Sequence, residues 1–338
     1  MTARRLFAFW PLAAGFLVLF VYAALWRAGA AEMRRAIDDW AEEQRAQGLS
    51  VTFDRVSVTG FPFILRGDIR DAAIAVPEGL SWRAERLMID ASLISPRALI
   101  FRAPQTQSLD LGRAGAWRMT TPTGRTRIAS ASNGSWSLEV QSGASRLERT
   151  DKAQAISTQK TRLIVAPDQD APSQINVALT LDDLSFTGGV APLRIEKIEA
   201  GLAIVLDPRL SSVAAIEPGA PAPRIVPGAV KINKLHIEAE GARLAATGTI
   251  TLDREGYPSG VLDAEIINPG GFASLLGKAG ALSPEEVEQA RAGLTLAAIA
   301  NGGKLSAPLV LKDGAAQIAG VAVAKLPHVG FEEEAPQP

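Results

Sequence analysis

GFPFILRG, residues 60–67, interrupts what otherwise reads as one continuous β-strand. Proline cannot donate a hydrogen bond to a strand ladder, so Pro62 belongs at an edge, at a strand start or at a bulge, and Gly60 permits a kink. We therefore predict a corner here between two strands, over residues 50–58 and 63–70. Two phenylalanines flank the proline and are expected to anchor the corner in the core: Phe61 and Phe63.

Alternation of apolar and polar side chains continues far beyond this corner and is typical of antiparallel strands with one wet face. The clearest apolar rows run over Ile175–Leu181, Ile198–Leu206, Leu244–Leu252 and Leu262–Ile266. Strands and helices do not alternate as βαβ units, which argues against a parallel sheet. The sequence predicts a mainly β protein in which an N-terminal transmembrane helix precedes an extended, curved antiparallel sheet.

Turn residues support the same arrangement. Asn133-Gly134 and Asp313-Gly314 each separate two strand-like stretches and suit two-residue hairpins. Asp253 to Gly256 reads as a longer hairpin loop that joins strand 244–252 to strand 261–267.

The N-terminal stretch from Leu6 to Trp26 contains 21 residues without a charge. A helix of that length rises about 31 Å, which matches a hydrocarbon core of about 30 Å. Arginines flank the stretch, and aromatic side chains lie toward its ends, where they prefer the membrane interface. These residues are Arg4, Arg5, Arg27, Trp10, Tyr22 and Trp26. The sequence predicts a membrane span.

A cleaved signal peptide is the alternative, because Ala28-Gly29-Ala30 offers a cleavage site after Ala30. The apolar core of a signal peptide is about 7–15 residues long, so the greater length favours an uncleaved anchor. With a short tail before the span, we expect the N-terminus to stay inside. The chain would then be a single-pass protein of the bacterial inner membrane with its main domain in the periplasm.

Two further helices are predicted. Residues 31–47 have apolar side chains at helical spacing and end before Gly48, and this helix either packs on the sheet or contacts a membrane surface or partner. Ser283 begins a helix that runs to about 300 and would cover part of the sheet. The predicted division is an anchor (1–30), an amphipathic helix (31–47), a β-rich domain (48–330) with a proline-rich loop or sub-domain break at 217–228, and a disordered tail (331–338).

Composition excludes several classes of function. The 35 basic and 36 acidic residues nearly cancel, which argues against a nucleic-acid partner. Cysteine is absent, and histidine occurs only as His236 and His328, so most metal and general-base sites lack ligands. His236 shares a strand face with Glu238, which we interpret as a solvated polar face. We predict no cofactor, no metal and no enzymatic activity.

The motif at 60–62 is followed by Trp82-Arg83-Ala84 and then by Pro96 at the next strand start. In this order, with GTITLDREGYPSGVLDAEI and APLVLKDGAAQIAGVAVAKLP further on, the chain resembles the family catalogued as domain of unknown function 2125. The resemblance implies an envelope location and this architecture, and it indicates no particular chemistry. The last third is also similar in pattern to AsmA-like envelope proteins, whose long curved sheets are proposed to handle lipids.

Two functions remain open. The apolar face could bind a lipid, an acyl chain or another apolar ligand, or it could be fully packed in a structural or protein-interaction component of the envelope. An alternating strand looks the same in both cases. For the first function, the candidate ligand-binding residues are Ile175, Val177, Leu179, Leu181, Ile204, Leu206, Leu262 and Ile266, and the structural motif comprises Gly60, Phe61, Pro62, Phe63 and Trp82.

Overall fold

A computed structural model of the whole chain describes most residues. The described ranges are 3–77, 79–92, 97–131, 134–171, 173–189, 191–206, 227–253, 256–299 and 302–326. Several predictions concern residues outside these ranges, namely Pro96, Asn133, His328, most of the loop at 217–228 and the tail at 331–338.

The described residues form three α-helices and twenty β-strands. The helices are α1 (Ala3–Ala46), α2 (Pro269–Lys278) and α3 (Pro284–Ile299). The strands are β1 (Ser50–Thr52), β2 (Arg55–Thr59), β3 (Ile64–Ala75), β4 (Leu80–Ser92), β5 (Ala98–Arg102), β6 (Thr106–Leu111), β7 (Ala116–Thr120), β8 (Gly124–Ser130), β9 (Trp136–Ser142), β10 (Ser145–Arg149), β11 (Ala155–Thr158), β12 (Lys160–Pro167), β13 (Gln174–Thr187), β14 (Leu193–Leu206), β15 (Pro227–Ala239), β16 (Ala242–Leu252), β17 (Pro258–Ile267), β18 (Lys304–Lys312), β19 (Ala315–Ile318) and β20 (Val321–Lys325).

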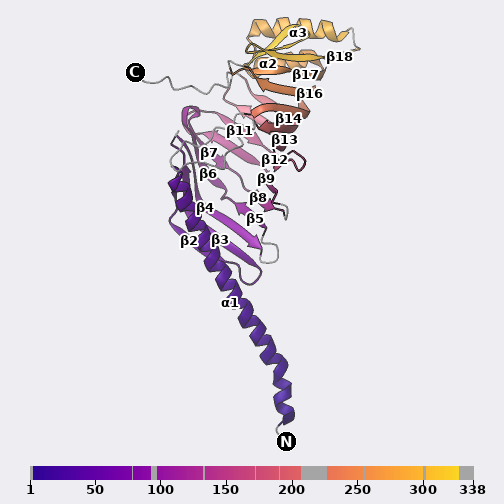
Figure 1. Cartoon of the computed structure of the whole chain (residues 1–338). Coiled ribbons are helices and arrows are strands. Elements are labelled where there is room, and N and C mark those ends of the chain that lie inside the picture. Colours follow the sequence, from indigo (N-terminus) through magenta and orange to yellow (C-terminus); the bar gives the residue numbers. More distant parts are fainter. Residues whose placement is uncertain are drawn as a thin grey trace, which may run out of the picture.

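All twenty strands belong to one antiparallel sheet, which confirms the predicted mainly β architecture. The strands lie one above another from α1 at one end of the sheet to the α2–α3 pair at the other (Figure 1). Asp313 and Gly314 both have left-handed backbone angles, with φ of 51° and 71°, as the predicted two-residue hairpin between β18 and β19 requires. Strands β16 and β17 pair as predicted.

The N-terminal helix is longer than predicted, because the span and the amphipathic helix form one continuous α1. The part from Gly15 to Ala46 contains an 18-residue window with a mean hydropathy of 1.4, so by length and composition this helix could cross a membrane. The alanine-rich junction around Gly29 contains no proline, so nothing there interrupts the helix. The helix ends at Ala46, and Gly48 follows with a left-handed φ of 88°, as the predicted C-terminal cap requires.

The corner at residues 60–63 is confirmed, since it forms the tight turn between β2 and β3. Gly60 has a φ of 100°, and a Cβ there would lie 2.7 Å from the Ile64 side chain. The prediction that the flanking phenylalanines lie in the core was wrong. Phe61 is 48% exposed and Phe63 is 74% exposed. The turn projects at the end of the sheet, where only α1 lies beside it, so no second layer covers these rings.

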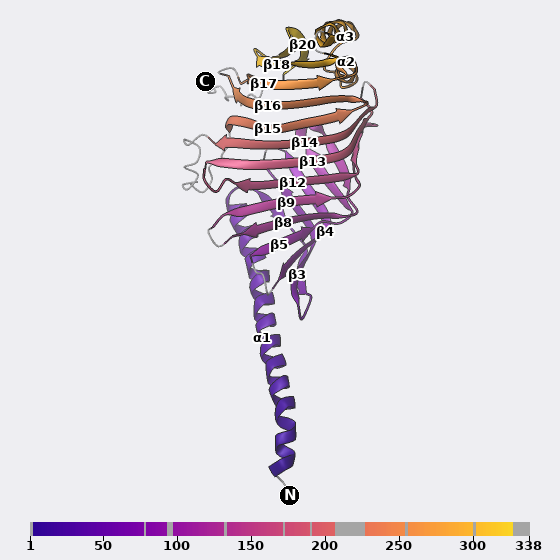
Figure 2. The same ribbon diagram turned by 90° about the vertical axis from the view of Figure 1, so that its right-hand side faces the viewer.

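Two separate sets of strands connect β4 to β13. We call these two sets the walls of the sheet, and the line along which they meet the crease. The C-terminal half of β4 pairs with β5, and its N-terminal half pairs with β6. In the same way, the N-terminal part of β13 pairs with β12, and its C-terminal part pairs with β11. The first wall is formed by β5, β8, β9 and β12, and the second wall by β6, β7, β10 and β11. In Figure 2 the first wall lies in front and the second behind it.

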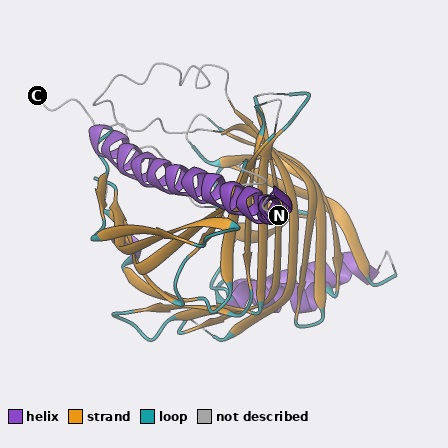
Figure 3. Cartoon of the chain, turned by 90° about the horizontal axis from the view of Figure 1, so that it is seen from below, coloured by secondary structure: helices purple, strands orange, loops and turns teal. Residues whose placement is uncertain are grey.

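The chain bends or breaks at six places along the crease. The interruptions fall at Asp71, 103–105, 121–123, 143–144, Gln159 and Asp183. Pro104 and Pro122 cannot donate ladder hydrogen bonds, and Asp71 and Asp183 have left-handed φ angles of 52° and 55°. A strand cannot run straight through such a residue, so the sheet folds along this line and its walls curve around a common interior (Figure 3).

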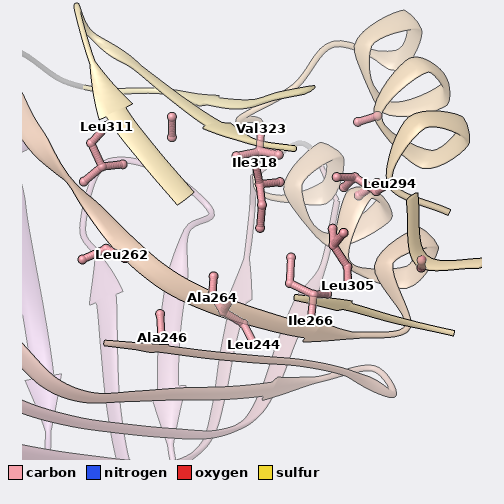
Figure 4. Packing of buried hydrophobic residues seen from close by; sticks show 14 of the residues in the cluster. Leu244, Ala246, Leu262, Ala264, Ile266, Leu294, Leu305, Leu311, Ile318 and Val323 are labelled. Carbon is pink, nitrogen blue, oxygen red and sulfur yellow. The ribbon is translucent and has the colours of Figure 1, made fainter. Parts of the chain in front are cut away.

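Two apolar clusters lie at opposite ends of the sheet. The distal cluster packs the last strands against α2 and α3, and includes the fully buried Ile266, Leu294, Leu305 and Ile318 (Figure 4). The proximal cluster packs Ile69 and Ile89 against Met33 and Ile37 of α1. The second half of α1 therefore packs on the protein's own sheet, as one of the two interpretations predicted.

Candidate functional site

One apolar row crosses the concave face of the sheet from the end beside α1, the proximal end, to the distal end. Register pairs connect its members directly, strand to strand, without a polar residue. The row comprises Leu65, Ala91, Leu99, Ile128, Leu138, Val165, Val177, Leu202, Ile232, Gly248, Leu262, Leu309 and Ile318. Thirteen strands at a spacing of about 4.8 Å give this row a length of about 60 Å.

Burial varies along this row. Leu65 is buried at the proximal end, and Leu262 and Ile318 are buried at the distal end, with 3% and 1% of their surface exposed. In the first wall, between these ends, Leu99 and Ile128 remain 36% and 39% exposed. Helices cover the two ends of the row. Between them no described helix lies over the row, and its side chains Leu138, Val165 and Val177 are half-buried. We call this interior surface the groove.

A large cavity lies at the mouth of the groove beside α1, with a volume of about 1000 Å³. Helix α1 forms one side of it with Met33, Ile37 and Trp40. The sheet forms the other side with aliphatic and aromatic side chains, including Leu65, Ile69, Ile74, Trp82, Leu87, Ile89, Leu99, Phe101 and Ile128. The mouth is therefore almost entirely hydrocarbon and begins less than two turns along α1 from Trp26.

A second cavity of about 440 Å³ continues the groove between the two walls. Trp82, Leu87, Phe101 and Thr126 line both cavities, which makes the two spaces adjacent. The first wall adds Val140 and Thr161, and the second wall adds Met119, Leu147 and Ile156. Side chains of both walls thus face one interior.

The second cavity has polar residues in its lining, among them Arg125, Gln141 and Arg146, and two buried polar side chains lie at the crease. Gln107 is buried there and accepts a hydrogen bond from Trp82 Nε1 at 2.8 Å. Thr121 is also buried, and its hydroxyl is without a hydrogen-bond partner in the described part of the chain. The groove is therefore apolar along its rows and weakly polar along its floor.

A family model matches residues 26–327, which is most of the chain. The family is described as "Uncharacterized protein conserved in bacteria (DUF2125)". The chain belongs to this DUF2125 family. The match confirms the resemblance of the motifs and covers both cavities and both clusters. No curated protein and no solved structure gives a significant match, and the AsmA-like resemblance is not shown by these comparisons.

The convex face of the DUF2125 sheet is charged. Arg162 pairs with Glu139 at 2.9 Å, and Glu199 binds both Lys197, at 2.6 Å, and Lys234. Hydrogen bonds from Lys197 and then from Lys234 lower the pKa of Glu199 to about 2. The two faces of the same strands therefore differ sharply, with ion pairs outside and hydrocarbon inside.

His236 lies on this convex face, across the sheet from the groove. Its Nε2 lies 3.0 Å from Glu238 Oε1, which also binds Arg243 Nε at 2.9 Å. The hydrogen bond from His236 is the main cause of the lowered pKa of Glu238, and Arg243 adds to it. Within the described residues, no group of three or more His, Asp or Glu side chains is placed to hold a metal ion.

The predicted ligand-binding residues fall into two environments in the DUF2125 fold. The row from Ile175 to Leu181 lies half-buried on the groove face, and Ile204 is the register partner of Ile175. Leu262 and Ile266 instead lie in the packed distal cluster, at 3% and 0% exposure. The side chain of Leu206 lies outside the described residues.

Sequence reasoning missed the mouth of the groove. The residues of α1 that line it, among them Met33 and Trp40, were assigned to an amphipathic helix without a cavity. The sequence indicates only a structural role for Trp82, whereas the structure places it in the lining of both cavities. The prolines at 104 and 122, each between two short strand-like stretches, were the available signal for the crease.

Proposed function

We propose that this protein is a membrane-anchored envelope protein that binds the acyl chain of a lipid in its groove. The observation that carries the proposal is the apolar row that crosses thirteen strands, is packed against helices at its ends and has no described helix over it between them. Soluble proteins rarely leave apolar surface of this extent exposed unless it binds something. The large mouth cavity lies beside the helix that could span a membrane.

The size and chemistry of the two cavities support an acyl chain as the ligand. Ligand sites commonly enclose about 300–1000 Å³ and are mostly apolar, and both cavities fall in this range. Burial of one methylene group contributes about 0.8 kcal/mol. A chain of many methylenes can therefore bind without any dedicated polar motif.

The same proposal assigns the chain a binding role and no catalytic one. The side chains that face the groove are largely hydrocarbon, whereas the His236–Glu238 pair lies on the convex face. A base on the opposite face of a sheet cannot reach a ligand in the groove.

The proposed location is the bacterial inner membrane, with α1 as an uncleaved anchor and the sheet in the periplasm. A phosphatase reporter fused after Leu326 is expected to be active, because the distal end of the sheet would be exported. The product should retain the N-terminal span. An inactive fusion, or a mature N-terminus at Ala31, would contradict the anchor and this topology.

Site-specific photo-cross-linking in intact cells tests the lipid proposal. Leu163 and Ile164 are adjacent in β12 and both half-buried, but they face the groove and the convex side respectively. We expect p-benzoylphenylalanine at position 163 to form adducts with lipid on irradiation, since an acyl chain would lie against it. Mass spectrometry of the purified protein identifies the adduct.

The matched control is the same cross-linker at position 164, which is expected to give little or no lipid adduct. Equal lipid adducts at both positions would indicate nonspecific contact. Absence of lipid at position 163 in a folded, membrane-bound protein would favour the structural or protein-interaction role. Protein adducts there would identify the partner.

A further inference from the structure

The turn at residues 60–63 is attached to the last turns of the candidate span. The Tyr22 hydroxyl donates a hydrogen bond to the Pro62 carbonyl, and Trp26 Nε1 donates to the Ile64 carbonyl at 3.1 Å. The Phe61 ring lies edge-on to Trp26, with 5.6 Å between ring centroids, and 6.1 Å from Tyr22. These contacts fix the height of the turn along α1.

That height coincides with the end of the uncharged stretch. Trp26 is the last residue of this stretch, and Tyr22 lies about 6 Å deeper at a rise of about 1.5 Å per residue. A turn bound to both residues lies beside the span rather than beyond it. In a membrane this is the interface, where tyrosine and tryptophan are enriched.

The chemistry of the turn fits a lipid environment. Residues 56–65 carry no charge, and the nearest charged residues are Arg55 and Arg66. The Phe63 side chain is 74% exposed although it is large and apolar. An exposed phenylalanine is unfavourable in water and favourable at the boundary between headgroups and acyl chains.

We infer that the Phe61–Phe63 turn inserts into the membrane interface as a second contact beside α1. The inference rests on the proposed anchoring by α1. Two attachment points restrain rotation of the sheet about the helix. They place the mouth of the groove, which begins at Gly29 and Met33 of α1, directly against the headgroup layer. A lipid chain could then pass from the bilayer into the groove without crossing water.

The absence of cysteine in the chain makes the test direct, because one introduced cysteine carries one label. The full-length Phe63→Cys protein is labelled with a polarity-sensitive fluorophore and reconstituted into phosphatidylethanolamine–phosphatidylglycerol vesicles. We expect the label to lose most of its fluorescence when the vesicles contain a headgroup-level nitroxide lipid. A nitroxide deep in the acyl chain should quench it less.

Two control sites separate this inference from the anchoring itself. Phe16 lies about 15 Å below Trp26, near the bilayer centre, and Phe16→Cys should be quenched best by the deep nitroxide. Leu296 is 72% exposed on distal α3, and Leu296→Cys should not be quenched. Quenching at Phe16 without quenching at Phe63 would overturn the inference alone. No quenching at Phe16 would overturn the anchoring and the inference together.

Discussion

Ile266→Ala is expected to lower the free energy of unfolding by about 3–4 kcal/mol, because the side chain is fully buried in the distal cluster. The substitution removes the transfer free energy of three carbon atoms and leaves a cavity that the surrounding leucines cannot fill. Strands β17 and β18 and both distal helices pack around this position. Chemical denaturation of the full-length protein, followed by circular dichroism, measures the change.

Val261→Ala is the matched control, since Val261 lies in the same strand but is 54% exposed. Its truncation is expected to change the free energy of unfolding by no more than about 0.5 kcal/mol. A small effect of Ile266→Ala would mean that the distal end is loosely packed. Leu262 and Ile266 would then belong to the ligand-binding surface rather than to a core.

Leu179→Glu is expected to reduce lipid adducts at position 163 by about tenfold or more. Leu163 and Leu179 are direct register partners on the groove face, so their side chains lie about 5 Å apart. An acyl chain bound at position 163 would desolvate a carboxylate at position 179. A cost of about 1.4 kcal/mol already lowers occupancy tenfold, and burial of an unpaired charge costs more.

Ala178→Glu provides the control, because Ala178 precedes Leu179 and is exposed on the convex face. Lipid adducts at position 163 should remain unchanged in this variant. Both variants are expected to fold, since neither position belongs to a buried cluster. Equal losses in the two variants would point to a general disturbance of the sheet, and no loss in either would place the lipid elsewhere.

Turns and helix ends of this protein can be predicted from the sequence, because residues within a few positions determine them. The Asp313-Gly314 hairpin requires left-handed backbone angles that these residues adopt readily. The start of α3 is fixed by a reciprocal capping box, in which the Ser283 hydroxyl accepts from the Glu286 amide and the Glu286 carboxylate accepts from the Ser283 amide. The corner at Pro62 follows from the missing amide donor.

The sequence of the GFPF motif did not predict the surroundings of its phenylalanines, because these depend on contacts with residues far away in the chain. Pro62 predicted a turn correctly, but nothing in its neighbourhood indicated that Phe61 would meet Tyr22 and Trp26. Those residues lie about forty positions earlier in the chain. The rings were assigned to a core because aromatic residues in strand sequences are usually buried.

The sequence by itself determined a long apolar N-terminal helix, an antiparallel sheet and an alternating apolar face on nearly every strand. Only the tertiary structure decided which parts of that face are covered. The row from Leu65 to Ile318 has one pattern throughout, yet helices bury its two ends whereas Leu99 and Ile128 stay 36% and 39% exposed beside a cavity. The alternation of apolar and polar residues shows which side of a strand is apolar. Whether that side is buried depends on where helices distant in sequence pack and on where the sheet folds at its crease.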